Sequence, residues 1–217
     1  MTKETMSKSF WNRYARFYDS EVLRFSRNAY EEMYRSMARQ LTKDMDVLEI
    51  ATGTGLIALN IAEYVHSIEA TDYSPKMIET ASKKQVPPNV HFSVEDATAL
   101  SFAAGSFDAV VISNALHIMP SPERALAQIR RVLKPGGLLI APNFTHGHLK
   151  ESGKVFGFIL RIVGFETYSK WTPEEYVAFI SKHGFSIISW RVLDAAFPLA
   201  YVEAKVCSEE LCLQETV

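Results

Sequence analysis

The stretch V-L-E-I-A-T-G-T-G, residues 47–55, is the most informative part of the sequence. It begins with apolar, strand-forming residues, continues into two closely spaced glycines, and precedes a helical pattern over residues 56–64. Glycines allow the backbone to approach a ligand closely, and the unpaired N–H groups of a helix N-terminus can donate to it. We therefore expect a nucleotide-like cofactor over the end of the first strand of an α/β sheet.

Outward from this stretch, the hydrophobic pattern alternates between strand and helix. Before it, residues 9–41 read as helical, because Ala29, Met33, Met37 and Leu41 recur every four positions. The predicted strands are 46–51, 67–72, 90–94, 107–112 and 137–141, and the helices between them are 56–64, 75–85 and 121–133. Regular alternation of this kind favours a doubly wound parallel sheet with helices on both faces.

The pattern changes after Pro142. Residues 152–170 contain glycines among apolar residues, and a helix is then predicted from Thr172, with Pro173 in its first turn and Glu175 completing a capping box. His183-Gly184 is expected to end that helix. Two strands follow, 185–192 and 199–206, joined by a link that suits an antiparallel pair and is too short for a helical crossover.

Composition narrows the possible classes of protein. The chain has 217 residues, a net charge of −2 and a pI of about 6.3, which suits one domain with a small cap and gives no sign of a nucleic-acid-binding surface. The first ten residues are polar, and no apolar run is long enough to span a bilayer. Cys207 and Cys212 have no metal-binding spacing, so we expect free thiols, no metal and a cytoplasmic location.

The glycine motif alone fits two cofactors. Gly53, Gly55 and Ala58 match the dinucleotide form G-x-G-x-x-A, and Asp72 lies close to where a ribose-binding acid is expected. The surrounding segments favour the other cofactor. They are Glu49 within the first strand, Glu69–Ser74 ending the second, Val94–Ala97 after the third, Ser106–Val111 in the fourth and Leu133–Gly137 leading into the fifth.

This ordered set resembles the class I S-adenosylmethionine (SAM)-dependent methyltransferases, in particular the methyltransferase type 11 branch with the ubiquinone/menaquinone-type enzymes. The resemblance covers residues 10–140 and continues to about 206. It implies a Rossmann-like seven-stranded sheet with the last strand antiparallel. Within a single domain it implies four regions: an N-terminal helical lid (1–41), a cofactor-binding core (42–141), a cap or substrate region (142–184) and a terminal strand pair (185–206).

One position departs from the family pattern. The family often has glycine where this chain has Ala51. Alanine disfavours a positive φ, so it should be tolerated if the residue stays in the β region and should weaken cofactor binding if it does not.

The resemblance assigns residues to each part of SAM. Ala51, Thr52, Gly53 and Gly55 would run along its methionine and ribose, with Glu49 orienting that loop or serving as a strand-end acid. Asp72 would accept both ribose hydroxyls. The remaining assignments are Tyr73 and Met77 on the adenine faces, Asp96 and the Ala97 N–H on the adenine edge, and the Asn114 backbone beside the methionine.

Aromatic residues near the N-terminus form a W-x-x-x-A-x-x-Y-D region that closes over the cofactor in similar enzymes. Tyr14 and Tyr18 could donate to the SAM carboxylate, and their rings would attract the sulfonium. Packing of an amphipathic helix onto the sheet is the alternative explanation.

The acceptor side is less well defined. SAM is already a strong methyl donor, so the protein must align the reactants, exclude water and remove a proton where the nucleophile carries one. His117 is the best candidate for a base, although it could equally cap its loop. Candidates for the acceptor wall are His146, His148, Tyr168 and Trp171. The two histidines lack the further ligands that zinc would need.

The predicted function is methyl transfer to a small molecule by in-line displacement. The apolar residues 155–165 would suit an aromatic or lipophilic acceptor, or peripheral contact with a membrane, but they could also simply cover the core. A NAD-dependent oxidoreductase is one alternative, because Tyr201-x-x-x-Lys205 mimics a dehydrogenase pair, and a non-catalytic SAM-binding protein is another. A nucleic-acid methyltransferase is disfavoured, because neither an N-P-P-Y-type motif nor a basic stripe occurs.

Overall fold

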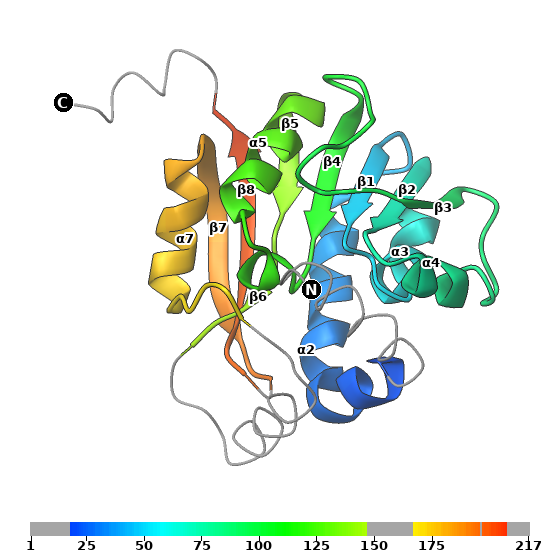
Figure 1. The fold of residues 1–217 in the computed structure, drawn as a ribbon, viewed down its shortest axis with the longest axis horizontal. Coiled ribbons are helices and arrows are strands. Elements are labelled where there is room, and N and C mark those ends of the chain that lie inside the picture. The colour runs from blue at the N-terminus through cyan, green and yellow to red at the C-terminus, as the bar shows by residue number, and fades with distance from the viewer. Residues whose placement is uncertain (1–17, 147–166, 196, 208–217) are drawn as a thin grey trace, which may run out of the picture.

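The computed structural model describes residues 18–146, 167–195 and 197–207. Helices flank a single sheet in this part of the chain (Figure 1). In chain order, the elements before the sheet's midpoint are α2 (Tyr18–Gln40), β1 (Asp46–Ile50), α3 (Leu56–Ile61), the 3₁₀ turn η1 (Ala62–Tyr64), β2 (Ser67–Asp72), α4 (Pro75–Ala81) and β3 (Val90–Val94). The later ones are β4 (Phe107–Ile112), the 3₁₀ turn η2 (Leu116–Ile118), α5 (Pro122–Val132), β5 (Leu133–Ile140), β6 (Asn143–Phe144), α7 (Pro173–Lys182), β7 (Phe185–Leu193) and β8 (Leu199–Val206).

The sheet has the order β3-β2-β1-β4-β5-β8, with β7 beyond β8 at the edge. The strands from β3 to β5 are parallel to one another, whereas β8 runs antiparallel to both β5 and β7. This confirms the doubly wound α/β class, the antiparallel last strand and the pairing of the two terminal strands. The order reverses between β1 and β4, and a crevice for ligands is expected at the carboxyl ends of the strands beside such a point.

The sheet contains one more strand than the seven predicted. The additional strand is β6, in which Asn143 and Phe144 pair with Ala200 and Leu199 of β8. Beyond it, both the N–H and the hydroxyl of Thr145 donate to the carbonyl of Pro198, at 2.8 and 2.9 Å. The chain therefore stays beside β8 after β5 has ended, which the pattern of hydrophobic residues did not reveal.

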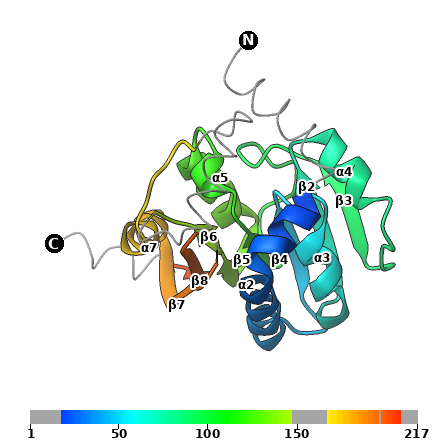
Figure 2. The ribbon, with the colours of Figure 1, turned by 90° about the horizontal axis from the view of Figure 1, so that it is seen from below.

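Two apolar clusters fill the faces of the sheet. The face covered by α2 and α3 includes Met33 and Met37, which are fully buried. The face covered by α5 and α7 includes Ile129 and Tyr176, which are equally buried. Figure 2 shows these pairs of helices on opposite sides of the sheet. Burial on both faces explains why the central strands read as nearly continuous apolar runs.

Helix α2 consists of two parts that meet at a kink. Ser26 has φ −139° and ψ 18°, values outside the helical range. After this residue the predicted four-residue repeat is confirmed, because Ala29, Met33, Met37 and Leu41 all contact the core. The part before it, residues 18–25, leads away from that buried stripe (Figure 2). Residues 9–17 of the predicted helix lie outside the described residues.

Several predicted boundaries shift. Helix α4 ends at Ala81, ahead of Pro87 and Pro88, rather than at residue 85. Strand β5 begins at Leu133 rather than 137, because Leu133 already pairs with Phe107 of β4. The start of α7 is confirmed: the N–H of Glu175 donates to Thr172 Oγ1 at 3.2 Å, and the N–H of Thr172 donates to Glu175 Oε2 at 2.8 Å.

Candidate functional site

The turn after β1 is an unusual piece of backbone. Ala51, Gly53 and Gly55 all have positive φ, at 56°, 58° and 79°. Ala51 therefore does not stay in the β region, and the weaker cofactor binding expected in that case stays a prediction. Just after Ile50 the chain still contacts β2, because the N–H of Thr52 donates to the carbonyl of Thr71 at 2.8 Å. A left-handed conformation costs an alanine about 1–2 kcal/mol.

Gly55 is required for steric reasons as well. A Cβ atom built on it would lie 2.7 Å from Cζ of Phe92 in β3 and 3.4 Å from Cβ of Ala81 in α4. The turn therefore lies directly against the side chains of the neighbouring strand and helix, and only glycine fits there.

Asp72 ends β2 and points across the turn. Its Oδ2 accepts from the N–H of Gly53 at 2.9 Å, and its Oδ1 accepts from the N–H of Ser74 at 2.8 Å. Burial raises the pKa of Asp72, and the hydrogen bonds from Ser74 and Gly53 partly oppose that effect. Each carboxylate oxygen keeps a further lone pair, so Asp72 can still accept two hydroxyl groups of a ligand.

Glu49 lies behind the turn rather than in the pocket. Its side chain is buried, and Oε2 accepts from the hydroxyl of Thr52 at 2.8 Å. Burial raises the pKa of Glu49 to about 8, against the lowering effect of its hydrogen bonds with Thr52 and the Ala58 backbone. Two acidic groups therefore lie close together in a desolvated place, which favours a positively charged ligand.

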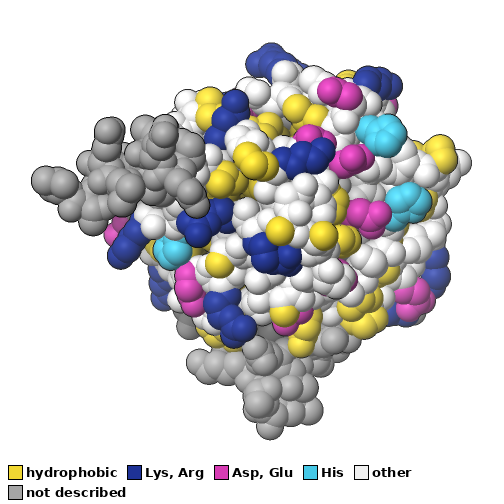
Figure 3. Space-filling model, turned by 90° about the horizontal axis from the view of Figure 1, so that it is seen from above, with side chains coloured by type: hydrophobic (Ala, Val, Ile, Leu, Met, Phe, Trp, Pro, Cys, Tyr) yellow, Lys and Arg dark blue, Asp and Glu magenta, His cyan; other side chains and the backbone are white. Residues whose placement is uncertain are grey.

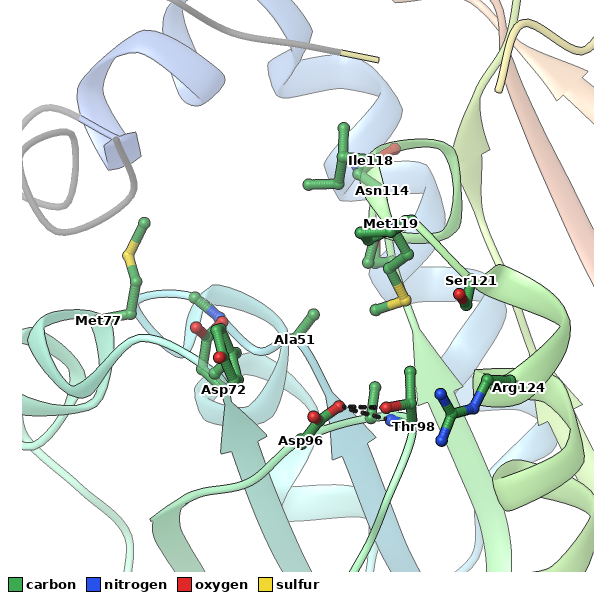
Figure 4. A pocket seen from close by; sticks show the side chains of 16 residues that line it. Ala51, Asp72, Met77, Asp96, Thr98, Asn114, Ile118, Met119, Ser121 and Arg124 are labelled. Atoms are coloured by element: carbon green, nitrogen blue, oxygen red, sulfur yellow. Dashed lines mark hydrogen bonds between the residues drawn. The ribbon is translucent and has the colours of Figure 1, made fainter. Parts of the chain in front are cut away.

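The pocket opens over the carboxyl ends of β1, β2, β3 and β4 (Figure 4). Of the residues predicted to bind the cofactor, eight line it: Ala51, Gly53, Asp72, Tyr73, Met77, Asp96, Ala97 and Asn114. Eight others that line it were not predicted: Thr98, Ser113, Ala115, Ile118, Met119, Pro120, Ser121 and Arg124. Apart from Thr98, the unpredicted residues all lie between β4 and β5, where the sequence predicted only Asn114 and His117 as site residues.

At one end of the pocket, Asp96 and Arg124 approach from opposite sides. Asp96 Oδ1 accepts from both the N–H and the hydroxyl of Thr98, at 2.8 Å each, and the side chain is exposed. Figure 4 shows Arg124, in the first turn of α5, reaching toward Thr98. This end therefore presents hydrogen-bonding groups of both kinds to a planar base.

Asn114 connects three elements at the end of β4. It also has a positive φ, 52°, which asparagine tolerates better than most residues. Its Nδ2 donates to the hydroxyl of Tyr30 in α2 at 3.1 Å, its Oδ1 accepts from the N–H of Phe144 at 3.0 Å, and its own N–H donates to Pro142 at 2.8 Å. Because the protein uses both ends of the amide, the backbone of Asn114 remains the better candidate for contact with a ligand.

His117 is buried in η2 and does not line the pocket. Its Nδ1 lies 2.9 Å from Oδ1 of Asn143, whose own Nδ2 donates to the carbonyl of Phe144. Oδ1 must therefore accept, and Nδ1 of His117 carries a proton. Burial lowers the pKa of His117 to about 4, and the hydrogen bond to Asn143 opposes this. His117 is thus a neutral imidazole held in one tautomer, and its role as a base stays a prediction.

The residues predicted for the acceptor wall belong to segments that are joined together. The N–H groups of Tyr168 and Ser169 donate to the carbonyl of His117 at 2.9 and 3.1 Å, and the N–H of His146 donates to that of Trp171 at 2.7 Å. The Trp171 ring stacks on Phe179 of α7, with centroids 4.6 Å apart. Trp171 therefore packs against the cap helix, and none of these residues lines the described pocket.

The side chains of three predicted site residues are not described by the structure. Tyr14 and His148 lie outside the described residues, and only the backbone of Tyr18 is described, at the start of α2. The apolar stretch 155–165 lies outside them as well.

The dehydrogenase-like pair has a different explanation. Tyr201 is fully buried in β8, with the guanidinium of Arg191 4.6 Å from its ring centre, whereas Lys205 is exposed. Neither side chain lines the pocket.

Within the described part of the chain, no helix is long and apolar enough to cross a membrane. On the face in Figure 3, Lys and Arg side chains are interspersed with acidic and apolar ones.

Comparisons with known proteins agree with this site. Residues 48–141 match the family described as "Methyltransferase domain". A demethylmenaquinone methyltransferase of Renibacterium salmoninarum is 41% identical over 100 residues, which are 46% of this chain and 41% of that protein. The chain matches under half the length of the first three curated relatives.

Solved structures share the fold over most of the chain. One chain of a Haloferax volcanii complex between the Trm112 methyltransferase activator and a methyltransferase gives a TM-score of 0.74 at 16% identity, covering 91% of this chain and 98% of that one. A SAM-dependent methyltransferase of Methanosarcina mazei gives 0.65 at 26% identity, covering 80% and 97%.

Proposed function

Because the chain belongs to the class I SAM-dependent methyltransferases, we propose that it transfers the methyl group of SAM to a small-molecule acceptor. The observation that carries this proposal is the hydrogen bonding of the backbone N–H groups in the turn after β1. The N–H groups of Thr52, Gly53 and Gly55 already donate to acceptors within the protein. A dinucleotide would need such groups for its pyrophosphate, so the turn suits SAM better than NAD.

The charge around the turn supports the same choice. Glu49, which is buried, and Asp72, which is half-buried, lie close to the place where the methionine and ribose of SAM would lie. A sulfonium or ammonium group would favour the ionised forms of both residues, whereas a pyrophosphate would be repelled by an ionised Asp72. SAM, when bound, supplies an electrophilic methyl group on a sulfonium.

The residues present fit the rest of the cofactor. Asp72 would accept the ribose hydroxyls, Asp96 and the Ala97 N–H would meet the adenine edge, and Met77, which is buried yet lines the pocket, would cover an adenine face. Tyr73 lines the same part of the pocket and is 47% exposed, so binding of adenine would remove much of its ring from water.

For the acceptor, we propose an aromatic, quinone-like or otherwise lipophilic molecule. Ile118 and Met119 give the pocket apolar walls beyond Asn114. Two relatives, at 41% and 38% identity, are named demethylmenaquinone methyltransferases. His117 is held neutral by its surroundings and would serve as a proton acceptor only if the acceptor reached it from the cap side.

The first experiment is calorimetric titration of the purified protein with SAM, with NADH as the control ligand. Micromolar binding of SAM and silence with NADH is the expected result. Binding of NADH without SAM would overturn the proposal in favour of an oxidoreductase. Turnover is then measured with a panel of phenols, quinols and lipophilic amines. SAM binding without turnover across a broad panel would favour a non-catalytic SAM-binding protein.

A further inference from the structure

The first turns of α2 contact the main body of the protein separately from the rest of the helix. The kink at Ser26 separates them from the half of α2 that is buried against the sheet. Figure 4 shows this part of α2 above the same side of the pocket as Met77. A described contact between this part of α2 and the rest of the protein therefore bears on the pocket.

Asp19, in the first turn of α2, supplies such a connection. Its Oδ1 accepts from the hydroxyl of Thr54, and its Oδ2 accepts from Nζ of Lys84 at 2.6 Å. Nζ of Lys84 also donates to the backbone carbonyl of Thr54 at 2.7 Å. These three residues form a closed set of contacts between α2, the turn after β1 and the segment after α4.

Thr54 connects these contacts to the glycine turn. It is completely buried and lies between Gly53 and Gly55, the two left-handed glycines of the turn. The hydroxyl and the carbonyl of Thr54 are both used by Asp19 and Lys84. The position of the turn is therefore fixed from outside the sheet, by side chains 35 residues before Thr54 and 30 residues after it.

Lys84 extends the connection to the other wall of the pocket. It follows α4, and its N–H donates to the carbonyl of Ala81 at 3.1 Å. The same helix carries Met77 into the pocket. The side chains of Lys84 and Asp19 are 26% and 33% exposed, whereas neighbouring Lys83, paired with Glu79, is 71% exposed. A partly buried pair with hydrogen bonds in good geometry is worth more than an exposed one.

We propose that Asp19 and Lys84 are positioning residues, which hold the first turns of α2, the glycine turn and α4 together in the arrangement that binds SAM. This inference rests on the proposed function. By linkage, SAM binding would in turn stabilise the first turns of α2.

The test compares SAM affinity among single variants by calorimetry. Lys84→Met should weaken SAM binding by about tenfold, within the range typical of coupled sites, and Lys84→Arg should restore most of the affinity because its guanidinium can donate to both partners. Lys83→Met is the matched control, since it removes an adjacent lysine with an exposed ion pair, and it should leave the affinity unchanged. Asp19→Asn should weaken binding, and the double variant should be no weaker than Lys84→Met alone.

A second measurement separates positioning from simple loss of stability. Amide hydrogen exchange at residues 20–25 should slow when SAM is added to the wild type, and this protection should be lost in Lys84→Met while the exchange of β1 and β4 stays as in the wild type. Wild-type SAM binding with equal affinity in Lys84→Met would overturn this proposal alone. A wild type that does not bind SAM would overturn the proposed function as well.

Discussion

The two walls of the pocket are built by different means. The wall at the ends of β1 and β2 consists of a left-handed turn whose amides are bound by Asp72 and by backbone carbonyls, with Glu49 buried behind it. The wall beyond β4 includes Asn114, whose side chain binds Tyr30, and behind this wall the buried His117 binds Asn143. The first wall depends on backbone conformation and acidity, and the second on neutral side-chain pairs. Substitutions should therefore act differently on the two.

The largest contrast is expected between two glycines with positive φ. Gly55→Ala should lower the free energy of unfolding by about 3 kcal/mol, since the new methyl group would meet the Phe92 ring in addition to the left-handed strain. Gly184→Ala, at the end of α7, should cost only about 1–2 kcal/mol, because the atom its methyl group would meet is the mobile end of Arg130. Urea denaturation measures both, and equal losses would contradict the steric argument.

The next effect concerns SAM affinity. Asp72→Ala should weaken binding by roughly 1.5–3 kcal/mol, the range for hydrogen bonds to a charged group. Asp96→Ala should cost less, about 0.5–1.5 kcal/mol, because Asp96 is exposed and already shares one oxygen with Thr98. Calorimetry on both variants checks the assignment of Asp72 to the ribose. That assignment would be wrong if Asp72→Ala bound SAM with the affinity of the wild type.

The contributions of Glu49 and His117 to the free energy of unfolding should change with pH in opposite directions. Glu49 has a pKa of about 8 when folded, above its usual value of 4.5, so the folded state keeps a proton that the unfolded state releases. Its contribution to stability is lost as the pH rises toward 8, at about 1.4 kcal/mol per pH unit at most. His117 has a pKa of about 4, below its usual 6.5, so its contribution is lost as the pH falls from 6.5 to 4.

Variants at these two positions separate the contributions. Between pH 6.5 and 8 Glu49 should act and His117 should not, and Glu49→Gln should reduce the fall in the free energy of unfolding over that range. His117→Gln should instead reduce the fall between pH 6.5 and 4. Urea denaturation at a series of pH values gives both slopes. A Glu49→Gln variant with the wild-type slope between pH 6.5 and 8 would show that Glu49 is ionised in the folded protein.

The smallest effect is expected from relieving strain. Ala51→Gly should raise the free energy of unfolding by up to about 1 kcal/mol, the left-handed strain less the entropy that glycine loses on folding. Asn114→Gly should lower it by about 1–2 kcal/mol, because it removes the hydrogen bonds with Tyr30 and Phe144. Thermal unfolding of both variants tests whether strain or bonding dominates at each position.

The sequence predicted local features better than distant ones. The turn at Gly53 and Gly55, the acid at Asp72 and the capping box of α7 could be predicted because each follows from residues close together in the chain. The contact of Asp19 with Lys84 and that of Tyr30 with Asn114 could not, because they join residues 65 and 84 positions apart. Nothing in the local pattern of a helix shows which of its polar residues will meet a distant partner.

The same limit applies to the shape of the pocket. Ile118, Met119 and Arg124 line it because η2 and the start of α5 turn back over β4. Periodicity predicts that a helix begins near Pro122, but it does not give the path of the connection that precedes it. The apolar residues within 116–120 did indicate that this connection is not an ordinary surface loop, because surface loops are mostly polar.

The place of β8 has a consequence for synthesis on the ribosome. Strand β5 ends at Ile140, but its antiparallel neighbour begins only at Leu199, and β7 reaches the sheet solely through that neighbour. A nascent chain that has emerged only as far as β5 would carry an open, apolar edge that invites pairing with other chains. The family-matched segment 48–141 should therefore aggregate when expressed alone, although it contains all the residues that line the described pocket.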